Sequence, residues 1–282
     1  MEIKKLGVVG AGTMGNGIAQ IAAQIGCEVV MRDIEMRFVE GGMKKVEAFL
    51  AKSVEKGKLE AKEKDAILGR IKGTVDMADL KDVDLVVEAV LEDIDLKKSV
   101  FKELDEICRP EVILATNTSS MSITEIAAST KRPDKVCGMH FFNPVPLMRL
   151  VEVIRGYATS DETIRVTTDL AQRMGKTTIE VKKDSPGFVV NRIMTPHFIE
   201  AIKIVEEGIA SIEDVDTAVK NGLNYPMGPF ELMDLTGIDI AYHVTEYLYK
   251  ELNKENKWVS PNLLKTMIRS GNLGRKTGKG WY

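Results

Sequence analysis

The stretch "GVVGAGTMGNGIAQ" at residues 7–20 decides the fold of this chain. Its glycines at 10, 12 and 15 form a G-x-G-x-x-G pattern that follows a short apolar run and opens a helix-like segment. In such a turn from strand to helix, Gly10 permits the tight turn and Gly12 lets the backbone approach a pyrophosphate, while Gly15 allows the helix to pack close to the sheet. We therefore predict a dinucleotide site here.

The front part of the chain alternates between strand-like and helix-like segments. Runs rich in β-branched residues predict strands at 5–10, 27–33, 83–90, 112–119, 135–142, 150–154 and 177–182. Helical patterns occupy 16–25, 36–56, 92–107, 122–129 and 160–175. This alternation predicts a parallel sheet with helices on both faces, which is a doubly wound, Rossmann-type α/β domain.

The pattern changes after "KKDSPG". Helical periodicities follow one another at 188–208, 211–222, 239–252 and 260–271. After residue 188, the sequence suggests a strand only in the last few residues. We therefore predict a dinucleotide-binding domain at 1–183 and a smaller, all-helical domain at 184–282.

Composition narrows the class of protein. The 282 residues carry a net charge of −3, which gives no general attraction to nucleic acid, and no apolar run has the length of a membrane span. Cys27, Cys108 and Cys137 are widely separated and form no C-x-x-C pair, so we expect reduced thiols in a cytoplasmic protein, with neither disulfides nor a metal site.

The end of the second predicted strand bears on the choice of cofactor. Asp33 stands where an acidic side chain can hydrogen-bond a ribose 2′-hydroxyl, and its charge would repel a 2′-phosphate. This favours NAD over NADP. Arg32 and Arg37 flank the position and could accommodate a phosphate, so NADP stays open.

A histidine and a glutamate are the candidate catalytic pair. His140 lies near the end of the strand predicted at 135–142, where doubly wound folds place their ligand crevice, and Glu152 lies within the apolar strand "LVEVI". A carboxylate in such a run costs several kcal/mol to bury alone, so it should have a partner. The pair would form a general base with its orienting group. A structural histidine and an edge-exposed glutamate are the alternative.

Seven motifs together resemble the L-3-hydroxyacyl-CoA dehydrogenase family, and within it the bacterial 3-hydroxybutyryl-CoA dehydrogenases. They cover nearly the whole chain in the family's order: "GAGTMGNGIA" (10–19), "VVEAVLED" (86–93), "NTSS" (117–120), "HFFNPVPLMRLVEVI" (140–154), "DSPGFVVNRI" (184–193), "YPMGPFELMDLTGID" (225–239) and "GRKTGKGWY" (274–282). The resemblance implies reversible hydride transfer between a nicotinamide and C3 of a short acyl-CoA such as acetoacetyl-CoA, in a homodimer. A dehydrogenase of a free hydroxy acid and a catalytically silent nucleotide-binding protein remain the alternatives.

The resemblance also implies roles for individual residues. His140 is the catalytic base and Glu152 its partner, while Ser119 and Asn191 position the substrate. The other reading of Ser119 is a cluster that caps the next helix, in which Ser120 or Ser122 could be the cap instead, and that of Asn191 is a tolerated interior polar residue. Lys52 and Lys56, one helical turn apart, are assigned to the phosphates of coenzyme A. A solvated charged face is the other reading for these two lysines, and also for Glu92, Lys97 and Lys276. The implied cofactor contacts are Gly10, Gly12, Thr13, Met14, Gly15, Asp33, Glu92, Lys97, Asn117, Ser119, Asn143 and Lys276.

Overall fold

The computed structural model describes residues 2–282, and the chain divides into two compact units. The first ends at Asp184 and the second runs from Ser185 to Tyr282. Asp184 belongs to the first unit, where its carboxylate accepts hydrogen bonds from Ser122 Oγ (2.7 Å) and Thr124 N (2.8 Å).

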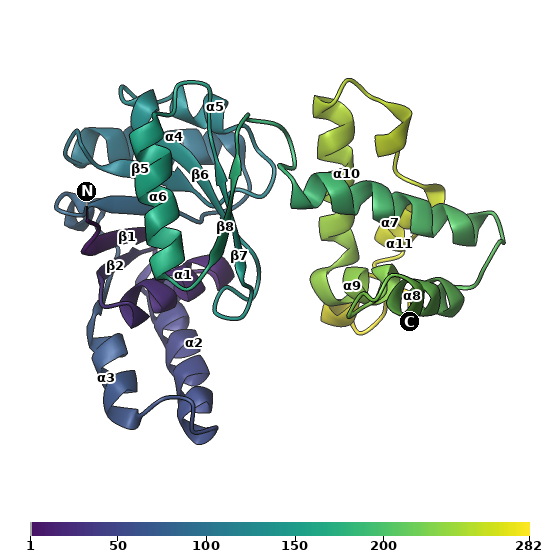
Figure 1. The fold of residues 1–282 in the computed structure, drawn as a ribbon, viewed down its shortest axis with the longest axis horizontal. Helices are drawn as coiled ribbons and strands as arrows, with labels where there is room; N and C mark the ends of the chain where they lie inside the picture. The colour runs from purple at the N-terminus through teal and green to yellow at the C-terminus, as the bar shows by residue number, and fades with distance from the viewer. Residues whose placement is uncertain (1) are drawn as a thin grey trace. The chain divides into compact units, whose positions relative to one another are not determined.

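The first unit is built on one eight-stranded sheet with the order β3-β2-β1-β4-β5-β6-β7-β8 (Figure 1). The order reverses between β1 and β4, and at such a switch point doubly wound folds bind their ligands, outside the carboxyl ends of the strands. The strands are β1 (Lys5–Val9), β2 (Glu28–Arg32), β3 (Ile71–Thr74), β4 (Leu85–Glu88), β5 (Ile113–Thr116), β6 (Val136–Phe141), β7 (Leu150–Ile154) and β8 (Thr177–Val181).

Helices connect the strands, and in Figure 1 the pair α2 and α3 extends away from the sheet. We did not predict α3 or β3. α3 has four consecutive charged residues among its nine and buries only Ile67, while β3 is a four-residue edge strand, "IKGT", without apolar alternation. The helices are α1 (Thr13–Gln24), α2 (Met36–Glu55), α3 (Ala61–Gly69), α4 (Ile94–Ile107), α5 (Ile123–Ala127) and α6 (Asp161–Arg173), with 3-10 turns at Met77–Leu80 and Pro133–Lys135.

The sheet is not wholly parallel, which corrects our prediction. β6 and β7 run antiparallel, whereas β7 and β8 are again parallel. The physical reason is the length of the connection at 142–149, since a parallel pair needs a crossover of about a dozen residues or more. The antiparallel register sets His140 directly opposite Glu152.

The connection at 142–149 is held from both sides. The buried Lys176 ammonium donates to the carbonyl oxygens of Val145 (2.6 Å) and Met148 (2.8 Å), and burial lowers the pKa of this lysine. On the other side, a Cβ added at Gly17 of α1 would lie 2.8 Å from Val145 Cβ, so this helix packs directly on the connection. The connection between β6 and β7 is therefore fixed against the helix that follows the glycine loop.

The three cysteines are free thiols buried in the first unit. Burial raises the pKa of Cys108 to about 11 and that of Cys137 to about 12. The pKa of Cys27 is also raised by burial. Because the thiolate is the reactive form, all three are chemically quiet.

The second unit is helical and has its own core around Phe198, Ile202, Phe230 and Met233. Its elements are α7 (Val190–Glu206), α8 (Ile212–Gly222), α9 (Pro229–Thr236), α10 (Ile238–Glu251) and α11 (Asn262–Arg269), with 3-10 turns at Asn256–Trp258 and Arg275–Thr277. We did not predict α9, which is only two turns long. In residues 2–282, no helix is both long and apolar enough to cross a membrane.

Two buried aspartates anchor the end of the chain. The Asp234 carboxylate accepts from the backbone amides of Trp281 (2.9 Å) and Tyr282 (3.2 Å), and the Tyr282 hydroxyl donates to Asp216 (2.8 Å). Burial and the Asp216 carboxylate together raise the pKa of Tyr282 above its usual range. The last residues are therefore a fixed part of the helical unit, although they form an isolated bridge between Gly274 and Lys279 and not a strand.

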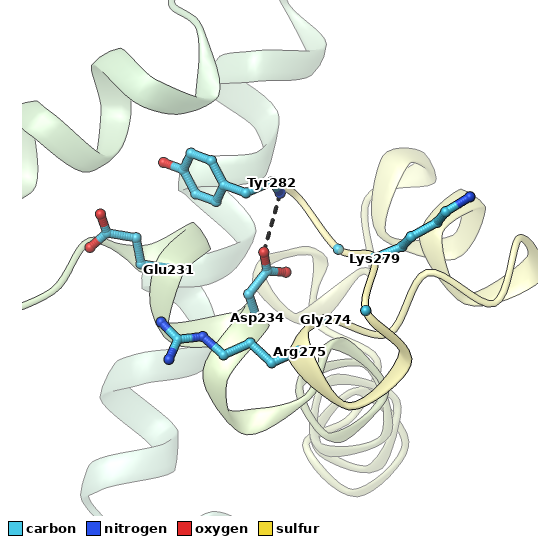
Figure 2. A pocket seen from close by; sticks show the side chains of 8 residues that line it. Glu231, Asp234, Gly274, Arg275, Lys279 and Tyr282 are labelled. Atoms are coloured by element: carbon cyan, nitrogen blue, oxygen red, sulfur yellow. Dashed lines mark hydrogen bonds between the residues drawn. The ribbon is translucent and has the colours of Figure 1, made fainter.

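An open pocket of about 480 Å³ lies beside this anchored tail (Figure 2). Charged side chains of both signs line it, namely Glu231 and Asp234 from α9 with Arg275 and Lys279 from the tail. Both carboxylate oxygens of Asp234 already accept from the backbone of the tail.

Candidate active site

The loop between β1 and α1 has the geometry that a bound pyrophosphate requires. Gly10 has φ 101°, and a Cβ there would lie 2.6 Å from the carbonyl oxygen of Ala89, while a Cβ at Gly15 would lie 1.7 Å from the Gly10 oxygen. A Cβ at Gly12 meets nothing within 4 Å, so this glycine borders open space. Gly12 is the N-cap of α1 and gives its first amides no side-chain partner. These amides fit an anion, as the sequence predicted.

Asp33 fixes this loop from the end of β2. Its Oδ2 accepts from the backbone amide of Ala11 at 2.7 Å, and its Oδ1 accepts from that of Ile34 at the same distance. The carboxylate is therefore held beside the glycine loop, where it can meet a ribose. Thr13 and Met14, two further predicted contacts, form the first turn of α1 next to it.

The two arginines that flank Asp33 are engaged elsewhere. Arg32 Nε donates to the carbonyl oxygen of Val75 at 3.2 Å. Arg37 pairs with Glu35 at 2.9 Å, and its guanidinium lies over the Phe38 ring, 4.8 Å from the centroid. Neither side chain is held toward Asp33 by these contacts.

His140 and Glu152 form a buried pair across β6 and β7. His140 Nδ1 lies 2.7 Å from Glu152 Oε2, the histidine is 5% exposed and the glutamate is fully buried. The alternative of an edge-exposed glutamate is therefore wrong. A hydrogen on Nδ1 satisfies this contact, because a carboxylate oxygen accepts, and it leaves Nε2 as the ring nitrogen for a ligand.

The residues around this pair come from the connection at 142–149 and from the end of β5. The centroids of the Phe142 and His140 rings lie 4.4 Å apart. The next residue, Asn143, is exposed, and its peptide bond to Pro144 is cis. Asn117 Oδ1 accepts from the backbone amide of Phe141 at 2.9 Å, which ties the end of β5 to the end of β6.

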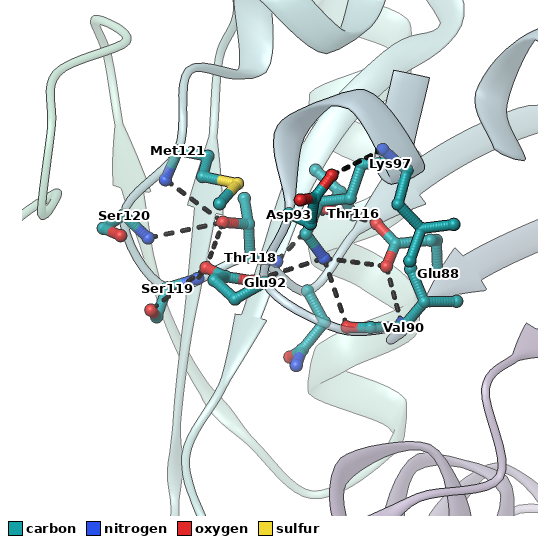
Figure 3. Close-up of polar contacts among 12 residues, drawn as sticks. Glu88, Val90, Glu92, Asp93, Lys97, Thr116, Thr118, Ser119, Ser120 and Met121 are labelled. Atoms are coloured by element: carbon teal, nitrogen blue, oxygen red, sulfur yellow. Dashed lines mark hydrogen bonds and ion pairs between the residues drawn. The ribbon is translucent and has the colours of Figure 1, made fainter. Parts of the chain in front are cut away.

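Glu92 organises the loop that carries Ser119 (Figure 3). Its Oε1 accepts from the backbone amide of Ser119 at 2.8 Å, from Ser119 Oγ at 3.2 Å and from the Thr118 hydroxyl. Ser119 does not cap the following helix, because the N-cap of α5 is Ser122. The helix-cap reading of Ser119 is therefore wrong.

Behind Glu92 lies an ion pair that the sequence analysis missed. Lys97 Nζ lies 2.8 Å from Glu88 Oε1 and 3.3 Å from Glu92 Oε2, and neither Glu88 nor Lys97 is more than 1% exposed. Lys97 is thus no solvated surface charge. The signal for Glu88 was present in "LVVEAV", where a carboxylate interrupts an apolar strand as Glu152 does.

Two of the predicted residues belong to the helical unit. Asn191 is buried near the start of α7, and Lys276 forms an ion pair with Asp239 of α10. Their contacts with substrate and cofactor stay predictions.

Lys52 and Lys56 lie at the exposed end of α2, the former in the last turn and the latter at the C-cap. Neither amine is ion-paired within the part of the chain that the structure describes. The assignment of these lysines to coenzyme A stays a prediction as well.

Comparison with known proteins gives the same answer as the geometry. Residues 5–185 match the model of the NAD-binding domain of 3-hydroxyacyl-CoA dehydrogenase, and residues 187–282 match that of its C-terminal domain. The chain belongs to the 3-hydroxyacyl-CoA dehydrogenase family. The glycine loop and Asp33 are therefore parts of an NAD-binding domain.

Individual members of the 3-hydroxyacyl-CoA dehydrogenase family match over almost their full length. The 3-hydroxybutyryl-CoA dehydrogenase of Clostridioides difficile is 48% identical over 99% of this chain and 98% of its own. The 3-hydroxybutyryl-CoA dehydrogenase of Mycobacterium tuberculosis is 42% identical over 99% of this chain and 98% of its own. The crystal structure of (S)-3-hydroxybutyryl-CoA dehydrogenase from Ralstonia eutropha superimposes with a TM-score of 0.96 at 48% identity, covering 100% of this chain and 99% of that one.

Proposed function

We propose that this member of the family is an NAD-dependent 3-hydroxybutyryl-CoA dehydrogenase. The observation that carries the proposal is the buried pair of His140 and Glu152, which lie 2.7 Å apart near the carboxyl end of β6. Doubly wound folds bind their ligands outside the carboxyl ends of the strands. The names of the similar proteins support the choice of a short acyl-CoA as the substrate.

His140 acts as the general acid and base. In oxidation its Nε2 takes the proton of the C3 hydroxyl, and in reduction it returns that proton to the ketone oxygen. Glu152 holds the ring through Nδ1 and stabilises the imidazolium that forms. Bound NAD supplies the acceptor of the hydride that leaves C3.

Ser119 and Asn191 position the reacting group. Because Glu92 as a carboxylate can only accept, the Ser119 hydroxyl donates to it and the Ser119 oxygen acts as an acceptor toward the ligand. That oxygen suits the hydroxyl of the substrate or the carboxamide of the nicotinamide. The Asn191 amide, near the start of α7, is proposed as a further polar group for binding the substrate.

NAD is preferred over NADP because of the surroundings of Asp33. A 2′-phosphate would be repelled by this carboxylate. Of the two flanking arginines, Arg32 donates to the Val75 carbonyl oxygen and Arg37 pairs with Glu35. The glycine loop and the first amides of α1 hold the pyrophosphate.

The remaining parts of the proposal concern the far end of the substrate and the assembly. Lys52 and Lys56 bind phosphates of coenzyme A, which their exposure and charge allow. The resemblance to the family supports a homodimer. The mass of the protein in solution tests the dimer.

A cofactor-oxidation assay tests the function as a whole. We expect NADH to be oxidised with acetoacetyl-CoA but not with free acetoacetate, and NADH to be used in preference to NADPH. His140→Ala serves as the control for background oxidation. Equal rates with free acetoacetate would favour a hydroxy-acid dehydrogenase, and no oxidation with either substrate would favour a silent nucleotide-binding protein.

A further inference from the structure

Glu88 is a fully buried carboxylate at the last position of β4. Three donors converge on it: the backbone amide of Val90 (2.7 Å) and Lys97 Nζ (2.8 Å) reach Oε1, and the Thr116 hydroxyl (2.7 Å) reaches Oε2. Glu88 therefore joins the ends of β4 and β5 to the first turn of α4, as Figure 3 shows.

Stability alone does not account for this arrangement. Removing two ions from water costs several kcal/mol each, and a well-packed apolar pair in place of a buried ion pair is often neutral or stabilising. The position of Glu88 is informative instead. Its strand lies beside β1 at the switch point of the sheet, and the carbonyl of the next residue, Ala89, packs against Gly10 of the glycine loop.

The contacts of Glu88 continue to Ser119 through two further side chains. Lys97 bridges from Glu88 to Glu92 Oε2 at 3.3 Å, and Glu92 Oε1 accepts from both the amide and the hydroxyl of Ser119. The Glu92 side chain is 40% exposed. Without a fixed ammonium beside it, this carboxylate could turn toward water and release Ser119.

We propose that Glu88 is a positioning residue for the reaction: its charge holds Lys97 against Glu92, and Glu92 in turn sets the place and the hydrogen-bond direction of Ser119. This inference rests on the proposed function, because Ser119 is there the group that meets the ligand. Glu88 itself touches neither substrate nor cofactor in this scheme.

The main variant is Glu88→Gln. Its amide oxygen can still accept from Val90 N and its amide nitrogen can donate to Thr116, so the variant removes mainly the charge that holds Lys97. The double variant Glu88→Gln/Lys97→Met removes both charges and leaves no unpaired buried ion. The neighbouring exposed pair Lys98 and Glu125, 3.2 Å apart, gives the matched control Lys98→Met/Glu125→Gln.

The first readout needs no cofactor. We expect faster hydrogen exchange at the Ser119 amide in Glu88→Gln, because that amide loses its fixed acceptor, and unchanged exchange in the control pair. With acetoacetyl-CoA and NADH, kcat should fall about 10- to 100-fold, the range expected when a reacting group is misplaced by a fraction of an ångström to 1 Å. The double variant should recover the melting temperature lost in Glu88→Gln, but not kcat.

Ser119→Ala completes the test. If Glu88 acts through Ser119, adding Glu88→Gln to Ser119→Ala should lower kcat little further. Two results would overturn the role of Glu88 but leave the proposed function intact. One is a multiplicative loss of kcat when Glu88→Gln is combined with Ser119→Ala, and the other is recovery of kcat together with the melting temperature in Glu88→Gln/Lys97→Met. Wild-type kcat in Ser119→Ala would remove Ser119 from the proposed function, and this inference with it.

Discussion

His140 and Glu152 face each other in register on β6 and β7, with 2.7 Å between Nδ1 and Oε2. The antiparallel pairing brings them together, and the fixed connection at 142–149 maintains the register. A base and its orienting group thus come from one hairpin of the sheet, so their spacing does not depend on the helical unit.

The first prediction concerns His140. Its replacement by alanine should lower kcat by about 100-fold or more, the usual contribution of a positioned general acid or base, and NADH binding should survive. Steady-state kinetics and fluorescence titration with NADH measure the two effects. A kcat within a few-fold of wild type would remove His140 from the mechanism.

The second prediction tests whether the two residues act as a unit. Glu152→Gln should also reduce turnover, since the amide keeps the shape but loses the charge that stabilises the imidazolium. In the double variant with His140→Ala, kcat should be little lower than in His140→Ala alone, because no ring is left to orient. Fully multiplicative losses would mean that Glu152 supports the strand independently.

The third prediction concerns Asp33. Asp33→Ala should reduce kcat/KM for NADH at least about tenfold, since a hydrogen bond to a charged group contributes about 1.5–3 kcal/mol. The kcat/KM for NADPH should fall less, because the variant no longer repels the 2′-phosphate. The preference for NADH should therefore shrink. The exposed Asp82 provides the control Asp82→Ala. An unmodified protein that prefers NADPH would contradict the assignment.

The fourth prediction separates the two ends of the substrate. Replacing Lys52 and Lys56 together with alanine should raise KM for acetoacetyl-CoA several-fold, as expected when exposed charge pairs worth about 0–1 kcal/mol each are lost. The dissociation constant of NADH should not change. Lys58→Ala/Lys62→Ala removes the same charge from the exposed surface nearby. If both double variants have wild-type KM, the four lysines are alike in serving only as solvated charges.

The fifth prediction is a dependence of stability on pH. Burial lowers the pKa of His197 on α7, whose Nε2 is buried and has no hydrogen-bond partner among residues 2–282. The unfolded chain therefore takes up the proton first as the pH falls below about 6.5, and the free energy of unfolding should decrease by up to about 1.4 kcal/mol per pH unit. Urea unfolding at several pH values measures this slope.

His197→Phe should flatten that slope, whereas the exposed His243→Phe should leave it unchanged. An identical slope in both variants and in the wild type would mean that other groups cause the acid sensitivity.

The fold could be predicted from the sequence wherever a residue pattern is decided locally. The glycine turn, the buried strands around it and the long amphipathic helices follow directly from periodicity. The edge strand β3 and the charged helix α3 could not be predicted, because each is held by its neighbours and has no pattern of its own. The antiparallel β7 was missed because strand direction depends on the length of a connection and not on the strand's residues.

The candidate site was predictable to a similar extent. His140 and Glu152 could be paired because a carboxylate in an apolar strand demands a partner. Glu88 gives the same signal, but its partners Thr116 and Lys97 lie on another strand and on a helix, and only the sheet order brings the three together.

The buried cysteines have a practical consequence. Because the native thiols are shielded and hold their protons well above neutral pH, maleimide dyes should react far more slowly with them than with a surface thiol. Cysteines introduced at exposed Lys62 on α3 and exposed Lys250 on α10 would then be the labelled positions in an otherwise wild-type chain. Energy transfer between two such dyes would measure whether the distance between the two labelled positions changes during turnover, without prior removal of any native cysteine.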